Sequence, residues 1–113
     1  MTEVPLNESA FLVLTALVAE PRHGYAVIEE VRRLSDGQVR LATGSLYAVL
    51  DKLRTGGLIE VDREEVVRSR LRRYYRLTGA GAERLATETE RLRRRANAAA
   101  AQLRRLAPGG GHA

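Results

Sequence analysis

Cysteine and tryptophan are absent from this 113-residue chain, and histidine, lysine, proline and aromatic residues are scarce. Without cysteine the chain has no disulfide, no thiolate metal ligand and no cysteine nucleophile, as is common in the reducing cytoplasm. The two histidines, His23 and His112, are too few for a histidine-based metal cluster. The sequence therefore predicts no catalytic residue, no metal site and no cofactor, and it favours a cytoplasmic location.

Long hydrophobic runs are also missing. The longest one, residues 10–19, is interrupted by Thr15 and is much shorter than the roughly 20 residues needed to cross a bilayer. No basic stretch precedes it, so neither a membrane span nor a signal peptide is expected. A content of 44% hydrophobic and 29% charged residues indicates one small folded domain that is neither disordered nor membrane-embedded.

Positive charge is in excess and unevenly distributed. The chain has 19 Lys+Arg against 14 Asp+Glu, and only Lys52 is a lysine. Residues 1–57 hold 6 basic and 7 acidic side chains, whereas residues 58–113 hold 13 and 7. Because the planar guanidinium group suits phosphates and base edges, the excess indicates a polyanionic partner. A solvated, arginine-rich surface without a ligand is the alternative.

Hydrophobic periodicity and turn residues divide the chain into helices and strands. Asn7, Thr43 and Thr78 have side chains typical of helix N-caps, and Gly56–Gly57 predicts the end of the third helix. The expected helices span residues 8–20, 24–34, 43–55 and 78–106, and the expected strands span residues 38–41, 58–66 and 71–77.

This order of elements predicts an α+β, mostly α fold: a winged helix-turn-helix followed by a long C-terminal dimerisation helix. The second and third helices form the helix-turn-helix, and the two longer strands form the wing. We expect a DNA-binding domain over residues 1–77, a dimerisation helix over residues 78–107 and a disordered tail over residues 108–113.

The third helix is the candidate reader of the major groove. Its start carries the small polar residues Thr43 and Ser45, which allow close approach, and its first amide groups can hold a phosphate. Tyr47 and Lys52 lie on the side expected to face solvent, where the tyrosine hydroxyl can donate to the DNA backbone. Partial burial of Tyr47 against the second helix is the alternative.

The predicted wing is strongly basic. Residues 66–76 contain five arginines and no acidic residue, and arginines on a protruding hairpin can reach phosphates or the minor groove. A charged edge that discourages strand-to-strand aggregation is the alternative. We expect Tyr75 to belong to the core. The five arginines are Arg68, Arg70, Arg72, Arg73 and Arg76.

The last helix carries an unbroken heptad seam, with spacings that alternate between three and four residues. A lone helix of this length has little in a 113-residue chain to cover that stripe, so we predict a homodimer; an intramolecular core helix is the alternative. Small residues at 96–101 allow close helix approach or leave room for a small molecule. The seam consists of Ala82, Leu85, Thr89, Leu92, Ala96, Ala99, Leu103 and Leu106. The arginines at 91–105 lie mostly off this seam and are expected to form a solvated flank; a second DNA surface is the alternative.

Three motifs, in order, resemble the PadR-like family of transcriptional regulators over about residues 6–106. The first is Arg-His-Gly-Tyr-Ala-Val-Ile at 22–28. The second is Gly-Ser-Leu-Tyr at 44–47, which continues through Leu50, Leu53 and Gly57-Leu58-Ile59. The third is Arg-Arg-Tyr-Tyr-Arg-Leu-Thr at 72–78, followed by Gly81.

The resemblance implies a small dimeric winged-helix repressor with one C-terminal dimerisation helix. It further implies binding to a palindromic operator in double-stranded DNA, association with the nucleoid, and control of detoxification, efflux or stress genes with release by a small-molecule effector. By that similarity His23, Tyr25, Ser45, Tyr47 and Lys52 approach the DNA. The wing contributes Arg70, Arg72 and Arg73.

The sequence departs from the family pattern in three places. Ala48 stands where family members often have proline. The wing tip, Arg68-Ser69-Arg70, has neither glycine nor proline, which favours a longer or more mobile tip. Residues 79–113 contain no aromatic residue, which argues against an aromatic-stacking drug pocket and places an effector among aliphatic residues and Phe11.

A second class of function is a winged helix that serves as a protein-interaction module, with the basic wing docked on an acidic partner. Competition by unrelated duplex DNA separates the two classes, since a protein partner is indifferent to DNA. An enzyme is the third class, and its only support is a base such as His23 beside a carboxylate. A histidine at the edge of a helix is an ordinary structural residue, so we expect no catalytic activity.

Overall fold

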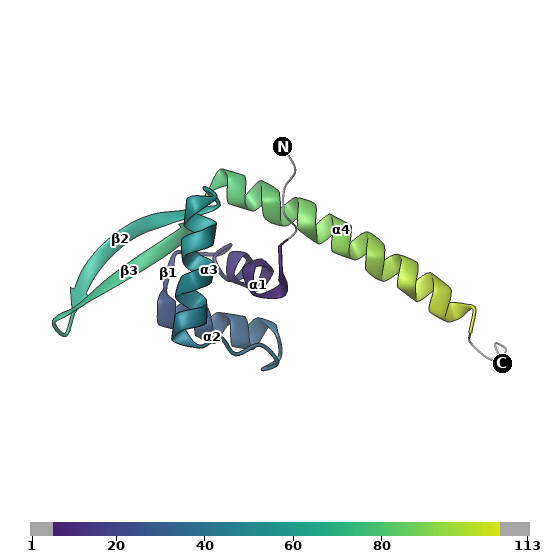
Figure 1. Cartoon of the computed structure of the whole chain (residues 1–113), viewed down its shortest axis with the longest axis horizontal. Coiled ribbons are helices and arrows are strands. Elements are labelled where there is room, and N and C mark those ends of the chain that lie inside the picture. The colour runs from purple at the N-terminus through teal and green to yellow at the C-terminus, as the bar shows by residue number, and fades with distance from the viewer. Residues whose placement is uncertain (1–5, 107–113) are drawn as a thin grey trace.

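The computed structural model describes residues 6–106, and the tail expected at 108–113 lies outside these described residues. Three short helices and a small antiparallel sheet form the body, and the β2–β3 hairpin and α4 extend from it on opposite sides (Figure 1). The expected mostly helical α+β fold with a winged helix-turn-helix is confirmed. The element order is α1 (Glu8–Ala16), β1 (Arg22–His23), α2 (Gly24–Leu34), α3 (Thr43–Thr55), β2 (Ile59–Val67), β3 (Arg70–Leu77) and α4 (Gly79–Arg104). No helix within 6–106 is both long and apolar enough to span a membrane.

The core lies where the three short helices meet the base of the sheet. Leu14 of α1, Val27 and Val31 of α2, and Leu46 and Leu50 of α3 are completely buried. These residues recur at three- and four-residue spacing, so each helix turns one apolar face inward. Tyr75 and Ile59 close the core from the sheet, as expected for Tyr75.

The third strand of the sheet is not the predicted one. Residues 38–41 form a loop, and β1 takes the edge position with His23 opposite Tyr74 in the order β1-β3-β2. The Ser35 hydroxyl accepts a hydrogen bond from the Val39 amide at 2.9 Å, which fixes the loop after α2. The alternation at 38–41 therefore reflects half-burial of Val39 and Leu41 without strand pairing.

Two local boundaries also differ from expectation. The first helix ends at Ala16, four residues before the expected end, because the chain tightens into three-residue turns there and the Arg22 side chain binds the Ala16 carbonyl. Thr43 is the first residue of α3 and does not cap it; the cap position is Ala42.

The hairpin tip is a two-residue turn in which Arg68 and Ser69 both have positive φ, 53° and 64°, so the expected longer tip is wrong.

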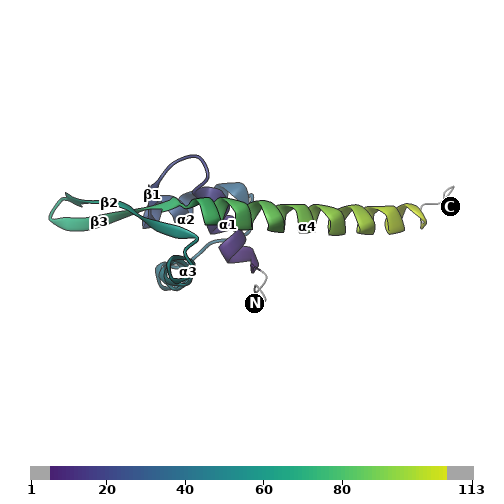
Figure 2. The ribbon, with the colours of Figure 1, turned by 90° about the horizontal axis from the view of Figure 1, so that it is seen from above.

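The long helix α4 begins at the predicted cap. The Thr78 hydroxyl accepts from the Gly81 amide at 3.0 Å and donates to the Gly57 carbonyl at 2.7 Å, which anchors the helix to the end of α3. Its first turns pack against α1, and Leu85 belongs to the intramolecular core. Its second half leaves the body in both views (Figures 1 and 2), and residues 92–106 are exposed.

Candidate nucleic-acid interface

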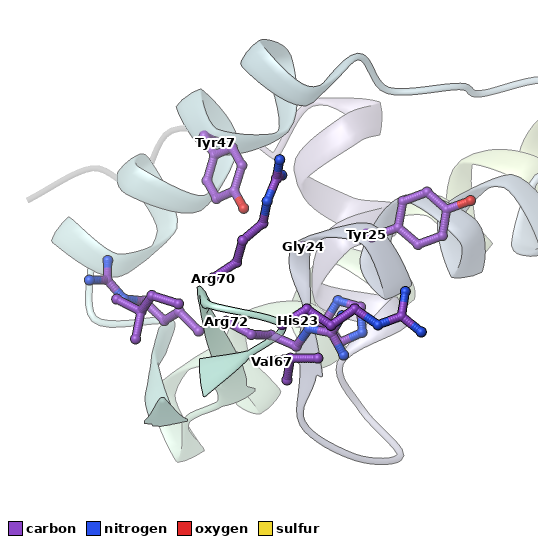
Figure 3. Close-up of a pocket in the computed structure, with 10 residues that line it drawn as sticks. His23, Gly24, Tyr25, Tyr47, Val67, Arg70 and Arg72 are labelled. Carbon is purple, nitrogen blue, oxygen red and sulfur yellow. The ribbon is translucent and has the colours of Figure 1, made fainter. Parts of the chain in front are cut away.

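A groove of about 760 Å³ lies between the start of α2, the exposed side of α3 and the hairpin (Figure 3). It brings together seven of the predicted contact residues from three separate parts of the sequence. Thr43, Ser45 and Lys52 do not line the groove; they lie exposed on α3. The lining residues are His23, Gly24, Tyr25, Tyr47, Val67, Arg68, Arg70, Leu71, Arg72 and Arg73.

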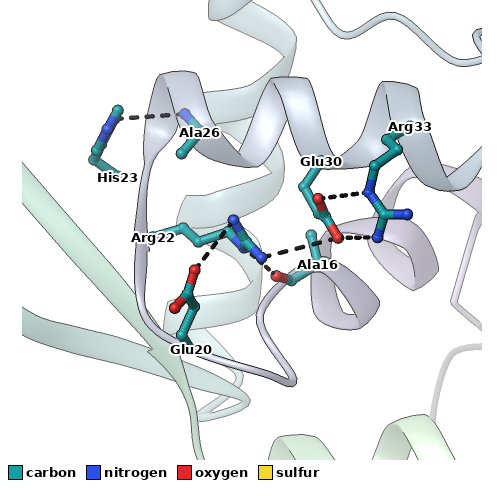
Figure 4. Close-up of polar contacts among 7 residues, drawn as sticks. All are labelled: Ala16, Glu20, Arg22, His23, Ala26, Glu30 and Arg33. Carbon is teal, nitrogen blue, oxygen red and sulfur yellow. Dashed lines mark hydrogen bonds and ion pairs between the residues drawn. The ribbon is translucent and has the colours of Figure 1, made fainter.

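His23 has the structural role at a helix edge that the sequence indicated, and the structure shows its form. Its Nδ1 accepts a hydrogen bond from the Ala26 amide at 3.4 Å, so the imidazole caps α2 (Figure 4). The ring also packs edge-on against Tyr74, with 5.3 Å between ring centroids. Burial lowers the pKa of His23, and the nearby Arg72 guanidinium lowers it further. The neutral imidazole that results keeps Nδ1 available as an acceptor.

Arg22 fixes α2 relative to α1, and its role was not anticipated from the sequence. Its Nε donates to the Ala16 carbonyl at 2.8 Å, and its other nitrogens lie 3.5 Å from Glu20 and 3.9 Å from Glu30 (Figure 4). Glu30 also accepts two hydrogen bonds from Arg33, at 3.0 and 2.6 Å, which lower the pKa of that carboxyl. The contacts of Arg22 with Ala16 and Glu30 join separate elements and therefore give no periodic pattern along the chain.

Tyr47 leans over the first residue of α2. A Cβ added to Gly24 would lie 2.8 Å from the Tyr47 hydroxyl and 3.3 Å from Leu46 Cδ2, so a side chain at position 24 would displace Tyr47 from this position. Tyr47 nevertheless keeps 45% of its surface exposed. Tyr47 therefore packs partly against α2 and still lines the groove.

The start of α3 is open. No side chain within residues 6–106 makes a capping hydrogen bond to its first turn, and Thr43, Gly44 and Ser45 are exposed. The first amide groups of a helix lack intrahelical partners and carry a partial positive charge. This end of α3 can therefore accept an anion from outside the chain.

The wing is less basic than its own sequence indicates, because β2 supplies carboxylates across the hairpin. Arg73 Nε lies 2.8 Å from Glu64, and Arg76 forms an ion pair with Glu60. We name Arg68, Arg70 and Arg72 the tip arginines: no carboxylate within the described residues lies in ion-pair distance of them. Positive charge therefore concentrates at the end of the hairpin that lines the groove, where Arg70 extends toward α3 (Figure 3).

Tyr74 organises the middle of the wing. Its hydroxyl donates to Glu65 at 2.7 Å, and the Arg63 guanidinium lies 3.8 Å from the centre of its ring. Together with the edge-on contact to His23, these interactions connect the wing to the cap of α2. The position of the tip arginines relative to α3 thus depends on a packed side-chain network.

A second cavity of about 450 Å³ lies between α1, the loop after α2 and α4. Phe11, Leu12 and Val39 give it apolar walls, and Glu88 lines it from α4. Glu88 is nearly fully buried and accepts hydrogen bonds from Arg91 and from Arg84, the latter at 3.3 Å. The Arg91 hydrogen bond is the main cause that lowers the pKa of Glu88, and burial opposes it.

A helix-turn-helix followed by a β-hairpin wing defines the winged-helix class of regulators, and in this chain α4 projects beyond it. The sequence model of the Transcriptional regulator PadR-like family matches residues 13–87, and the chain belongs to this family. The family comprises transcriptional regulators, which are not enzymes. Within residues 6–106 no group of three histidine or acidic side chains could hold a metal ion.

Individual proteins are also similar to this chain in sequence or in structure. A Lysinibacillus sphaericus protein called "Uncharacterized protein X" is 27% identical over 70 residues, which are 62% of this chain and 64% of that protein. A PadR family regulator of Clostridium difficile R20291 has a similar structure, with a TM-score of 0.74, 21% identity and coverage of 86% of this chain and 99% of that chain.

Two further structures are similar. A padr family regulator of Eggerthella lenta DSM 2243 has a TM-score of 0.69 and 26% identity, over 83% of this chain and 80% of that chain. Bacillus subtilis PadR in complex with operator DNA has a TM-score of 0.62 and 20% identity, over 69% of this chain and 45% of that chain. The matched part of this chain thus covers less than half of Bacillus subtilis PadR.

Proposed function

We propose that the chain is a homodimeric, sequence-specific DNA-binding repressor of the cytoplasm, which acts on detoxification, efflux or stress genes and is released by a small-molecule effector. The observation that carries the proposal is the groove in which the tip arginines face the exposed side of α3. An open helix start beside a cluster of guanidinium groups suits a polyanion with a groove for the helix to enter.

Duplex DNA would contact two surfaces, one that reads bases and one that binds the DNA backbone or the minor groove. The exposed side of α3 reads base edges in the major groove, while the tip arginines bind phosphates or the minor groove beside it. His23, in its capping role, orients the start of α2 and thereby Tyr25. The complete set of proposed contact residues is His23, Tyr25, Thr43, Ser45, Tyr47, Lys52, Arg68, Arg70, Arg72 and Arg73, with Arg73 the weakest because Glu64 already binds it.

The proposed dimer forms through α4, so that residues 1–77 act as the DNA-binding domain and residues 78–107 as the dimerisation helix. Leu92, Leu103 and Leu106 are exposed and available to a second chain, whereas Leu85 already packs in its own core. Two recognition helices related by a two-fold axis would read a palindrome with half-sites about 34–36 Å apart. The operator complex of Bacillus subtilis PadR supports duplex DNA as the partner of this fold.

The cavity between α1, the loop after α2 and α4 is the proposed effector site. Its apolar walls, to which α4 adds Leu92, suit the apolar part of a small molecule, with Phe11 as the one aromatic contact among the lining residues and Glu88 as a polar group. A ligand there would contact both the DNA-binding body and the proposed dimerisation helix, so that binding can change the spacing of the two recognition helices.

Selection of duplexes from a randomised pool by the purified chain tests the function. We expect a palindromic consensus, and an affinity for it that falls steeply between 50 and 200 mM salt, about 10³-fold or more for six or more phosphate contacts. Recovery of no consensus, or competition by unrelated duplex equal to that of the selected one, would contradict sequence-specific binding. An acidic protein partner would instead remain bound in the presence of competitor DNA.

A further inference from the structure

Two large apolar side chains are exposed near the end of the wing. Val66 and Leu71 lie directly opposite each other in the β2–β3 ladder and keep 71% and 61% of their surface exposed. Every other apolar side chain on the base of the same sheet face, such as Tyr75, is buried or half-buried. The core of the molecule therefore does not account for Val66 and Leu71.

The charged residues around Val66 and Leu71 indicate which kind of partner this pair contacts. Leu71 lines the groove together with the tip arginines, and the turn Arg68–Ser69 follows one residue beyond Val66. At about 3.3 Å per residue the hairpin carries this pair some 13 Å beyond the buried Tyr75. The wing of a second copy would bring the same positive charge and be repelled, whereas the charge around the pair is complementary to a polyanion.

We propose that Val66 and Leu71 contact the deoxyribose walls of the minor groove, next to the major groove that α3 enters. This inference rests on the proposed DNA-binding function and deepens it. The minor groove is about 6 Å wide, so the side chains of the hairpin end, and not the whole ribbon, reach its walls. The walls are built of apolar sugar atoms between phosphates, which matches an apolar pair flanked by guanidinium groups.

The test uses the full chain with both residues replaced, Val66→Thr and Leu71→Thr. Threonine is β-branched and preserves the strand, but it removes most of the apolar surface. Val18→Thr is the matched control, because Val18 is similarly exposed but lies just after α1 and does not line the groove. The probe is the duplex that the wild-type chain selects from the randomised pool. Urea unfolding verifies that the variants are folded, and Leu71→Thr alone serves if the double variant is not.

We expect the double variant to bind the selected duplex roughly tenfold more weakly, with an unchanged salt slope because no charge is lost. Hydroxyl-radical protection of the sugars beside each half-site should disappear, while protection of guanine N7 in the major groove persists. Wild-type affinity with a wild-type sugar footprint would overturn the proposal, and so would a changed salt slope, which would mean that the pair acts by placing the arginines. Failure to select any duplex would instead contradict the proposed function itself.

Discussion

At the scale of single residues, the entry to α4 depends on a glycine. A Cβ added to Gly81 would fall on the Leu58 carbonyl oxygen and lie 2.9 Å from Leu77 Cδ1, whereas a Cβ on Gly79 meets no atom of the described chain within 4 Å. We predict that Gly81→Ala lowers the free energy of unfolding by about 2–3 kcal/mol, because the obstacle is backbone and cannot move aside. Gly79→Ala should raise it by about 0.5 kcal/mol. Urea unfolding at a fixed protein concentration measures both, and equal effects would contradict the close approach.

Glu88 gives a pH-dependent prediction at the same scale. Its folded-state pKa is lowered, chiefly by the Arg91 hydrogen bond, so it stabilises the fold above its unfolded pKa of about 4.5 and loses this effect as the pH falls through the folded value. We therefore expect Glu88→Gln to be less stable than the wild type at pH 7, with the difference shrinking below about pH 4.5. Thermal unfolding across pH 3–7 tests this. Glu90→Gln, which removes only exposed ion pairs with Arg93 and Arg94, is the control and should change little.

The residue types at the candidate site could be predicted from the sequence, but several of their roles could not. His23 and Tyr47 were identified because their motifs place them beside the helix-turn-helix. The capping bond from Ala26 to His23 depends on the extended backbone by which the chain enters α2. The approach of Tyr47 to Gly24, 23 positions away, depends on how α2 and α3 pack, and neither contact leaves a periodic signal.

At the scale of elements, the wing shows why a charge count along one strand misleads. Residues 66–76 are free of acid, but the antiparallel register sets Glu64 opposite Arg73 and Glu60 opposite Arg76. The hairpin itself was predicted to within one residue at each end, because its alternation and flanking turns are local. The strand β1 could not be predicted, since two residues carry no alternation and its position is determined only by pairing with β3.

This distribution of charge gives a graded prediction for the wing. Arg70→Gln and Arg72→Gln should each weaken DNA binding across all sequences and reduce the salt slope by about 1, since each removes one phosphate contact. Arg76→Gln, at the base of the wing and paired with Glu60, should leave the slope nearly unchanged. Fluorescence anisotropy over a series of salt concentrations provides the slopes. A slope that fell equally in all three variants would show that the cross-strand carboxylates do not neutralise the arginines.

At the scale of the whole molecule, the proposed DNA contact and the proposed dimer contact lie at opposite ends of the longest axis, which extends 64 Å. The tip arginines lie toward one end and the exposed half of α4 toward the other, with the buried core between them (Figure 1). The first turns of α4 belong to that core through Leu85, and α4 also lines the cavity beside α1 through Glu88. This arrangement links the proposed dimer contact to the proposed DNA contact through one continuous helix.

The proposed dimer can be disrupted without disturbing the body. Leu103 and Leu106 keep 63% and 78% of their surface exposed, so Leu103→Glu with Leu106→Glu should leave the fold intact. Facing each other across a two-fold seam, the glutamates would bury charge and repel, and we expect monomers by sedimentation velocity at micromolar concentration. Affinity for a palindrome should fall about 100-fold or more, because the second half-site is no longer bound intramolecularly.

The matched control places the same charges off the seam. Asn97→Glu with Ala101→Glu adds two glutamates on the outward positions of α4 and should remain dimeric, with at most a small electrostatic loss of DNA affinity. If both double variants stay dimeric, the chains associate through another surface. If both lose palindrome binding equally while one stays dimeric, the added negative charge accounts for the loss and the seam does not. Dissociation and loss of binding that are confined to the Leu103/Leu106 variant support a dimer built on α4, since the two variants add the same charge and only one of them alters the seam.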